Sequence, residues 1–376
     1  MTVRVNPALF CVVIAAGGLL CRSGAETLSP APSQITVAAD GSGDFRTVQA
    51  AIDSLPPNSP QPAVIRIRPG RYKERIRLGP LHPHVTLAGD GPGAAKNTIL
   101  TYDLSARSLG PDGKPVGTSG SASVELQADD FTAVDLTFEN SAGPGKVAGQ
   151  AVAVKVTGDR CLFRRCRFIG WQDTLYASAS TMRPASDAPA APPATTAPRP
   201  TNPPASGGAP NGSMPGANRM CRQYYQDCFI TGDVDYIFGS ARAVFERCTI
   251  RSRAPGAITA HARTDPDQPG GYVFRNCDLT ADPSVPPGSV TLGRPWRPYA
   301  RVVFLSSRMG PHINPKGWDN WRDPSREKTA FYAEADCTGP GANRGERVPW
   351  ARTLSAAEKA EFETNRFLSG ADNWKQ

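Results

Sequence analysis

The chain has 376 residues, of which 36 are glycine, 37 are proline and 39% are hydrophobic. This composition disfavours a helical bundle and favours many short strands separated by turns. The formal charge of +8 is scattered along the chain without a nucleic-acid-binding motif, so we expect no nucleic-acid partner, whereas an acidic extracellular polymer would suit a basic protein.

The first 25 residues have the pattern of a secretory signal peptide. Arg4 supplies the positive end, residues 8–21 form an apolar run, and the stretch SGA (23–25) is a small-x-small cleavage site. The apolar run is too short to span a bilayer well, so we expect an exported protein (extracellular or periplasmic) with no membrane partner. Acylation of Cys21, as in a lipoprotein, is disfavoured because Leu20 stands where a small residue is expected.

A short amphipathic helix follows near the start of the mature chain. Val48, Ala51, Ile52 and Leu55 recur at helical spacing after Thr47. We expect this helix to cover one end of the fold.

Four cysteines share a local frame, in the segments RRCRF, QDCFI, ERCTI and RNCDL. In each segment the next-but-one residue after the cysteine is apolar, which is the period-2 pattern of a strand. The segment FTAVDLTF fits the same frame with Leu136 in place of the cysteine. Short strands that recur every 20 to 30 residues, with loops of variable length between them, predict a parallel β-helix. The four cysteines are Cys166, Cys228, Cys248 and Cys277.

These cysteines are predicted to be buried and free. A column of small apolar side chains is one way to fill the interior of a β-helix, and free cysteine is among the most buried residue types. Removal of the signal peptide leaves seven cysteines, which is an odd number without a disulfide-scaffold pattern, although the sequence does not exclude individual disulfides. The four histidines lack metal-site spacing, and we expect no metal.

Residues 178 to about 220 interrupt this pattern. Ten prolines fall there among Ala, Thr, Ser and Gly, so the segment cannot bury enough apolar surface to offset its ordering entropy. We predict a disordered insert within one turn of a single β-helix domain that spans residues 26–376.

Two aspartates come together when the insert is looped out. GWQDTLYA is then followed by QYYQDCFITGDVDYIFG, which places Asp235 one coil beyond Asp173. Two neighbouring carboxylates in an aromatic setting can divide labour, one as an ionised nucleophile and the other as a protonated acid. Aspartates also occur as turn corners in solenoids, and the spacing alone leaves both interpretations open.

Amide, guanidinium and indole groups accompany the two aspartates. Gln150 stands 22 residues before Gln172, within the range of one coil, and two amides can donate to a developing oxyanion. Arg294 could pin a carboxylate, and Trp296 could offer a flat surface to a sugar ring. The structural alternatives are an amide ladder for the glutamines, a surface salt bridge for Arg294 and plain core for Trp296.

The last predicted element is a C-terminal helix. The stretch LSAAEKAEF offers Ser355 with Glu358 three residues later, which is the pattern of a capping box. We expect this helix to protect the end of the solenoid.

Five ordered blocks carry a resemblance to a known family. GRYKE (70–74), GQAVAV (149–154), WQDTLY (171–176), GDVDYIFG (232–239) and LGRPW (292–296) resemble the signature blocks of pectin methylesterases in that family's order. The stretches NSAGPGK and GWDNW are also similar, so the resemblance covers the chain from about residue 35 to residue 374 except for the insert.

The resemblance implies an all-β, right-handed parallel β-helix with short capping helices at its ends. It implies hydrolysis of the C6 methyl esters of galacturonate units in pectin, without a cofactor, and we expect a monomer.

By position in the blocks, Asp235 would be the nucleophile, Asp173 the general acid and then base, and Arg294 the residue that holds Asp235. The oxyanion hole would be formed by Gln150 and Gln172. The residues that would bind the sugar chain are Tyr176, Trp296 and Trp318.

Three rival functions stay open at this level. A pectate lyase should show a calcium-binding carboxylate cluster, and only Asp265 and Asp267 come close; a glycosidase needs two carboxylates but not paired glutamines. A carbohydrate-binding protein without activity has no need of the five site residues together. An esterase or thioesterase for another acyl group would act on its own substrate and not on pectin.

Overall fold

The structure is a computed structural model and describes residues 33–91, 93–179 and 219–376. The predicted signal peptide (1–25) and nearly all of the predicted insert (178–220) lie outside these ranges.

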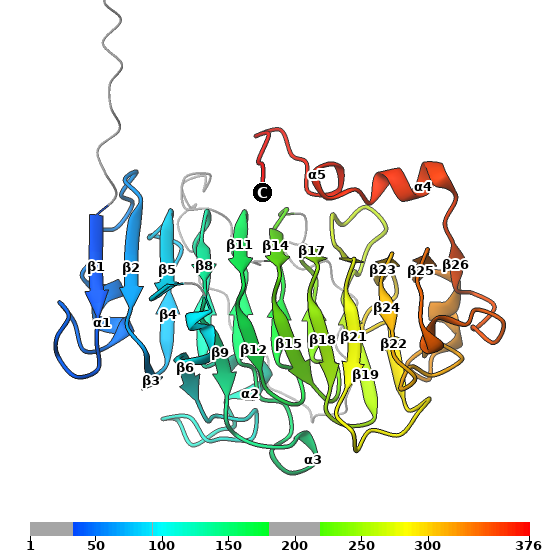
Figure 1. The fold of residues 1–376 in the computed structure, drawn as a ribbon, viewed down its shortest axis with the longest axis horizontal. Coiled ribbons are helices and arrows are strands. Elements are labelled where there is room, and N and C mark those ends of the chain that lie inside the picture. The colour runs from blue at the N-terminus through cyan, green and yellow to red at the C-terminus, as the bar shows by residue number, and fades with distance from the viewer. Residues whose placement is uncertain (1–32, 92, 180–218) are drawn as a thin grey trace, which may run out of the picture. The chain divides into compact units, whose positions relative to one another are not determined.

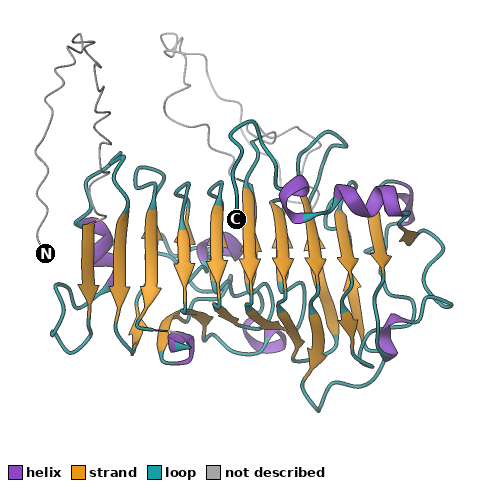
Figure 2. Ribbon diagram, turned by 45° about the horizontal axis from the view of Figure 1, so that its top comes forward, coloured by secondary structure: helices purple, strands orange, loops and turns teal. Residues whose placement is uncertain are grey.

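The described residues form a right-handed parallel β-helix, which confirms the predicted fold class (Figures 1 and 2). Three parallel sheets run along it, with 11, 8 and 7 strands, and each full coil contributes one strand to each sheet. Sheet A contains β1 (Ser33–Val37), β2 (Ala63–Ile67), β5 (Val85–Gly89), β8 (Thr132–Val134), β11 (Cys161–Arg164), β14 (Arg222–Gln226), β17 (Arg242–Glu246), β20 (Gly271–Arg275), β23 (Arg301–Leu305), β25 (Phe331–Ala335) and β26 (Arg352–Thr353).

Sheet B contains β3 (Gly70–Lys73), β6 (Thr98–Tyr102), β9 (Thr137–Asn140), β12 (Arg167–Ile169), β15 (Phe229–Gly232), β18 (Thr249–Ser252), β21 (Asp278–Ala281) and β24 (Arg308–Met309). Sheet C contains β4 (Ile76–Leu78), β7 (Val124–Leu126), β10 (Val154–Val156), β13 (Leu175–Ala177), β16 (Ile237–Gly239), β19 (Gly256–His261) and β22 (Val290–Gly293). The helical segments are α1 (Val48–Asp53), η1 (Ala94–Lys96), α2 (Gly117–Gly120), α3 (Gly145–Ala148), η3 (Pro324–Lys328), η4 (Pro340–Ala342), α4 (Ala356–Glu361) and α5 (Thr364–Phe367).

The register of sheet B confirms the repeat found in the sequence. Phe168 pairs with Phe138 on one side and with Ile230 on the other, and the row continues through Ile250 and Leu279. All five side chains are fully buried. Equivalent apolar positions therefore stack on one another from coil to coil, which is what lets a chain of short strands build a continuous core.

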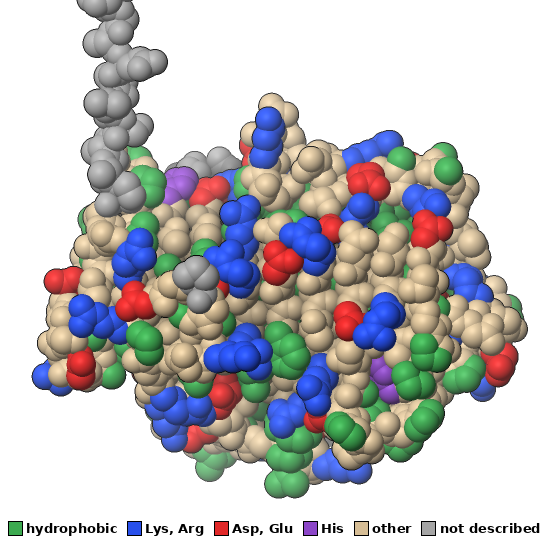
Figure 3. All heavy atoms as spheres, viewed as in Figure 1, with side chains coloured by type: hydrophobic (Ala, Val, Ile, Leu, Met, Phe, Trp, Pro, Cys, Tyr) green, Lys and Arg blue, Asp and Glu red, His purple; other side chains and the backbone are tan. Residues whose placement is uncertain are grey.

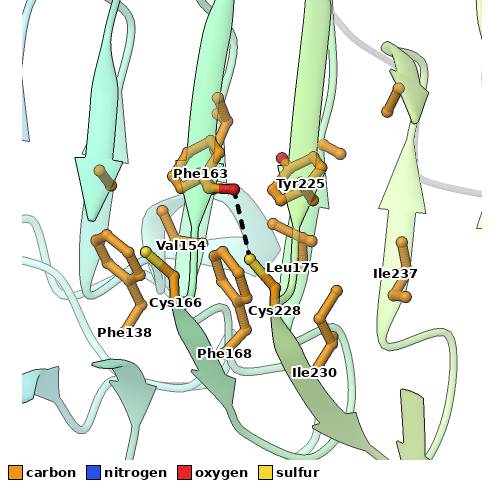
Figure 4. Packing of buried hydrophobic residues seen from close by; sticks show 14 of the residues in the cluster. Phe138, Val154, Phe163, Cys166, Phe168, Leu175, Tyr225, Cys228, Ile230 and Ile237 are labelled. Atoms are coloured by element: carbon orange, nitrogen blue, oxygen red, sulfur yellow. Dashed lines mark hydrogen bonds between the residues drawn. The ribbon is translucent and has the colours of Figure 1, made fainter. Parts of the chain in front are cut away.

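The predicted cysteine column is buried and free, and it lies at the turns that lead into sheet B rather than within the strands. The thiols donate to backbone carbonyls of the preceding coil: Cys228 reaches the oxygen of Phe163 at 3.6 Å, and Cys248 reaches that of Tyr225 at 3.4 Å. Figure 4 shows Cys166 and Cys228 beside the stacked aromatic rings. These thiols fill the core and satisfy the backbone at each corner, so they have a structural role.

Both predicted terminal helices are present. Helix α1 begins after Thr47, whose hydroxyl accepts from the N–H of Ala50, and α4 begins with the predicted capping box of Ser355 and Glu358. The C-terminal helices do not lie across the last coil. They run back along the outer face of sheet A (Figure 1), where Phe362 and Phe367 pack with Val303 in one apolar cluster.

Candidate active site

Asp173 and Asp235 occupy equivalent corners of successive coils. They lie two residues before Leu175 and Ile237, which pair with each other in sheet C. Both aspartates have positive φ values, 65° and 50°, a region in which Asp and Asn are better tolerated than other non-glycine residues. The N–H of Asp173 donates to the carbonyl of Val234 at 3.1 Å, so the corner itself fixes one carboxylate next to the other.

Arg294 holds one of the two carboxylates. Its Nε and Nη2 atoms donate to Oδ1 and Oδ2 of Asp235 at 2.8 and 2.7 Å, which is a bidentate pair. The other face of the guanidinium lies 3.9 Å from the ring centre of Trp321. Within the described ranges, no side chain forms a hydrogen bond or ion pair with the carboxyl group of Asp173. The two aspartates therefore differ sharply in their partners.

This difference in partners gives the carboxyl groups of the two aspartates different pKa values. Burial raises the pKa of Asp173 well above the ordinary aspartate value, and the neighbouring charge of Asp235 raises it further. Burial also raises the pKa of Asp235, but the hydrogen bonds and the charge of Arg294 oppose that rise. Asp235 is therefore the carboxyl group that ionises first, while Asp173 keeps its proton to higher pH.

The two carboxylates open into a cleft of about 450 Å³. Gln150 and Gln172 line it as well, and backbone contacts place them: the carbonyl of Gln172 accepts from the N–H of Ala151, and that of Gln150 accepts from the N–H of Ala106. The cleft thus gathers two acids, a guanidinium and two amides at one place on sheet C. Its full lining is Thr118, Ser119, Gln150, Gln172, Asp173, Tyr176, Asp235, Phe238, Ala260, Arg294, Trp296 and Trp321.

Sequence relatives identify the family. The model of the pectinesterase family matches residues 34–183 and 218–371. Pectinesterase 31 of Arabidopsis thaliana is 36% identical over 338 residues, which cover 89% of this chain and 92% of that protein. Pectinesterase QRT1 of the same plant is 34% identical over 344 residues, which cover 90% of this chain and 78% of that protein. The chain belongs to the pectinesterase family.

Solved structures of similar proteins agree with this assignment. Pectin methylesterase from carrot has a TM-score of 0.73 and 31% identity, covering 92% of this chain and 96% of that one. The deglycosylated pectin methylesterase from Aspergillus niger has a TM-score of 0.67 and 30% identity, covering 87% and 92%. A pectin methylesterase solved in complex with a hexasaccharide has a TM-score of 0.69 and 27% identity, covering 90% and 97%.

Most of the predicted site residues of this family member meet in the cleft, including the aromatic side chains of Tyr176 and Trp296. Tyr176 stacks on Phe238 with ring centres 4.3 Å apart, and Trp296 lies 6.0 Å from the same ring. These three rings form one wall beside the carboxylates. An aromatic wall of this kind offers apolar faces to a sugar ring.

The prediction for Trp318 is wrong. Its side chain is only 2% exposed, stacks on Tyr332 and donates from Nε1 to Oε1 of Glu334 at 3.1 Å. Trp318 continues the row of sheet C as the bridge partner of Gly293, so its side chain points into the core. Trp321, three residues later in the same GWDNW stretch, lies in the loop beyond this row and lines the cleft instead.

The sequence reasoning also missed Phe238, Ala260, Thr118 and Ser119. Phe238 lies within the quoted block GDVDYIFG, and the strand register Tyr176 to Phe238 could have placed it on the same face as Tyr176. Thr118 and Ser119 belong to the short helix α2, which comes from a loop two coils earlier than the aspartate corner of β13. Nothing in the local sequence indicates that this loop reaches the cleft.

Further features of the described residues bear on other classes of function. No group of three or more His, Cys, Asp or Glu side chains in these ranges is arranged to hold a metal ion. None of the helices within them has the length and apolar character needed to cross a membrane. On the face shown in Figure 3, basic side chains are interspersed with acidic ones instead of forming one patch.

Proposed function

We propose that this cleft hydrolyses the C6 methyl ester of galacturonate units in pectin, through Asp235 as nucleophile and Asp173 as general acid and base. The observation that carries the proposal is the contrast between the two aspartates. Asp235 is held in bidentate contact by Arg294, whereas the carboxyl group of Asp173, next to it, forms no ion pair with any described side chain and has a raised pKa. An ionised carboxylate beside a protonated one supplies both a nucleophile and a proton donor for the cleavage of an ester.

In the first half-reaction, an Oδ atom of Asp235 attacks the ester carbonyl carbon and forms a tetrahedral oxyanion. The side-chain amides of Gln150 and Gln172 line the same cleft and can donate to that oxyanion. The bond to the methoxy oxygen then breaks, and Asp173 gives its proton to the leaving methoxide. Methanol departs, and the galacturonyl group remains joined to Asp235 as a mixed anhydride.

In the second half-reaction, Asp173 is now ionised and takes a proton from water. The resulting hydroxide attacks the galacturonyl carbon of the anhydride, and the bond to the Asp235 oxygen breaks. The Asp235 carboxylate is thereby restored, and the product departs as galacturonic acid, which then loses its proton to the solvent. Asp173 regains its proton in this step, so the cycle closes with one water consumed and one methanol formed. Arg294 keeps Asp235 in place throughout, because its guanidinium forms two parallel hydrogen bonds to that carboxylate and is backed by the Trp321 ring.

We further propose that the polymer lies along the aromatic wall of the cleft, that the enzyme acts as a monomer without a cofactor, and that it is exported. Without residues 1–25, which contain Arg4 and Arg22 and no acidic residue, the formal charge is +6 (40 basic minus 34 acidic residues), and this positive charge suits a product that becomes a polyanion as its esters are removed.

The test is methanol release from highly methylated pectin by the purified mature chain. We expect methanol without a matching rise in reducing ends. Release of reducing ends or unsaturated products would assign the cleft to a glycosidase or a lyase. Hydrolysis of acyl thioesters with no action on pectin would assign it to another esterase class.

A further inference from the structure

A third buried carboxylate, Asp233, lies beside the proposed site and has no role in the reaction described above. Its side chain is 4% exposed. Oδ1 accepts from the N–H of Val234 at 2.7 Å, and Oδ2 accepts from the N–H of Gly145 at 3.3 Å. The second contact joins residues that are 88 positions apart in the chain, so it is a link between two coils and not a local turn.

Gly145 begins helix α3, in the segment that carries Gln150 into the cleft. This segment leaves sheet B after β9, and Asn140 anchors its start by donating from Nδ2 to the carbonyls of Leu104, Ser121 and Val152. The carbonyl of Gln150 anchors its end by accepting from Ala106. Between these anchors, the contact with Asp233 is the hydrogen bond that, among the described residues, ties the segment to the next coils.

The packing around Gly145 is close. A Cβ atom at this position would lie 2.8 Å from Cβ of Gln172 and 3.1 Å from both carboxyl oxygens of Asp233. Gly145 is therefore seated between Gln172 and Asp233, with no room for a side chain. One glycine thus connects the segment of Gln150, the side chain of Gln172 and the carboxylate of Asp233.

We propose that Asp233 is a positioning residue that acts through Gly145 to hold Gln150 against Gln172, so that both amides point at one oxyanion. This inference rests on the proposed function, because it assigns Asp233 to the oxyanion site of that reaction. It requires hydrogen-bond acceptance by the side chain, and it does not require the negative charge. A donor that is misplaced by about 1 Å can cost on the order of 10²-fold in rate, so a segment that is held less firmly should lower the rate of the chemical step.

The surroundings of Asp233 suit an anchor. Burial raises its pKa, and the N–H groups of Val234 and Gly145 oppose that rise, as does the charge of Arg253. Arg253 is itself fixed, since it stacks 3.6 Å from the ring centre of Trp171 and donates to the carbonyl of Gly170 at 3.0 Å. The carboxylate is therefore held from several sides while one oxygen faces Gly145.

The test is a double-mutant cycle on methanol release with Asp233→Ala, Gln150→Ala and the double variant, measured as kcat and KM. We expect Asp233→Ala to lower kcat about 10- to 100-fold with KM changed less than about 3-fold, because the loss should be smaller than that for removing the donor itself. In the Gln150→Ala background the same substitution should cost less than about 3-fold, since the group that it positions is gone. Asp233→Asn can keep its one acceptor oxygen toward Gly145 but must turn its NH2 group toward the N–H of Val234, so it should recover part of the lost kcat and show a clearly smaller loss than Asp233→Ala.

One further variant provides a second test of the proposal, and another serves as a control. Gly145→Ala adds a Cβ atom that would disturb the contact between Gly145 and Asp233, so it should also lower kcat. This variant keeps the proposal testable if Asp233→Ala does not fold. Val147→Ala alters an exposed side chain of the same helix and should leave kcat unchanged. Additive losses in the cycle, or equal losses for Asp233→Asn and Asp233→Ala, would overturn the inference. An unimpaired Gln150→Ala variant would instead contradict the proposed function itself.

Discussion

Two of the left-handed corners that recur along the described β-helix share one backbone design. At the corners between sheets A and B, Arg165 has a φ of 52° and its N–H donates to the carbonyl of Gln226 in the next coil. At the corners before sheet C, Asp173 has a φ of 65° and donates in the same way to Val234. The backbone of a corner therefore does not reveal whether its side chain has a structural or a chemical role.

The partners of the side chains do separate them. Between sheets A and B, Asp135 forms a bidentate contact with Arg165 of the next coil, and Asp227 does so with Arg247. In the cleft, Asp173 meets Asp235, a group of the same charge, and the available guanidinium serves only Asp235. Opposite charges stacked from coil to coil stabilise a solenoid, whereas like charges stacked in a buried cleft raise a pKa and cost stability.

The largest difference in methanol release should come from making the same Asp→Asn substitution at each of the two kinds of corner. Asp235→Asn removes the nucleophile while keeping a residue that tolerates positive φ, so methanol release should fall to background in a folded protein. Asp227→Asn makes the same substitution at a structural corner and should leave the rate within about 2-fold. Methanol assays and thermal melts on both variants measure this, and similar rates for the two would remove the distinction drawn here.

Asp173→Asn should lose activity and gain stability. Without the proton donor the rate should fall by ~10²–10⁴-fold. Because the folded-state pKa of Asp173 lies above its unfolded value, the folded state binds the proton more tightly, and ionisation of this group lowers stability as pH rises above the unfolded pKa of about 4. The variant should therefore melt at a higher temperature than the wild type at pH 7, with a smaller gain near pH 4. An equal gain in melting temperature at both pH values would mean that folding does not raise the pKa of Asp173.

The two tryptophans of the GWDNW stretch should give opposite phenotypes. Trp318→Ala empties a packed core site and should lower the free energy of unfolding by about 3–5 kcal/mol. Trp321→Ala removes the ring that backs Arg294 and lines the cleft, so it should lower kcat/KM by about 10-fold with a minor change in stability. Denaturant unfolding and methanol assays on both variants measure these effects. A loss of activity without a loss of stability in Trp318→Ala would show that Trp318 contributes to the cleft after all.

The smallest effect is expected at an exposed structural pair. Asp227 and Arg247 are 43% and 49% exposed, and a pair of this kind contributes about 0.2–1 kcal/mol. Asp227→Asn removes the charge and keeps a residue that tolerates the positive φ of 54° at this corner, so it should lower stability only within that range, and the difference should shrink in high salt. A loss above about 2 kcal/mol at moderate ionic strength would show that the corner column depends on its ion pairs far more than we argue.

The sequence predicted those features that depend on repetition. The apolar row through Phe168 and Ile230, the buried cysteines and the alignment of Asp173 with Asp235 all follow from positions that recur once per coil. What it could not supply are contacts made by loops that leave the coil. The place of Trp321 over Arg294 depends on a non-repeating loop, as does the contact of Gly145 with Asp233, and no periodicity reports on either.

The C-terminal segment shows the same limit. The capping box of Ser355 and Glu358 identifies helix α4 from its local sequence alone. Its packing along the outer face of sheet A depends on apolar residues of several coils, including Val244 and Val273, and short-range patterns do not encode that direction.

The most direct measurement is the titration of the Asp173 carboxyl group, by infrared difference spectroscopy on protein with ¹³C-labelled aspartate and with Asp173→Asn to assign the band. We expect a protonated Asp173 at pH values where an ordinary aspartate is ionised, because burial and the charge of Asp235 both raise its pKa. We also expect Asp235→Asn to lower this pKa, since that substitution removes the neighbouring charge. An Asp173 that titrates near the ordinary value of about 3.9, unaffected by Asp235→Asn, would contradict the division of labour between the two aspartates.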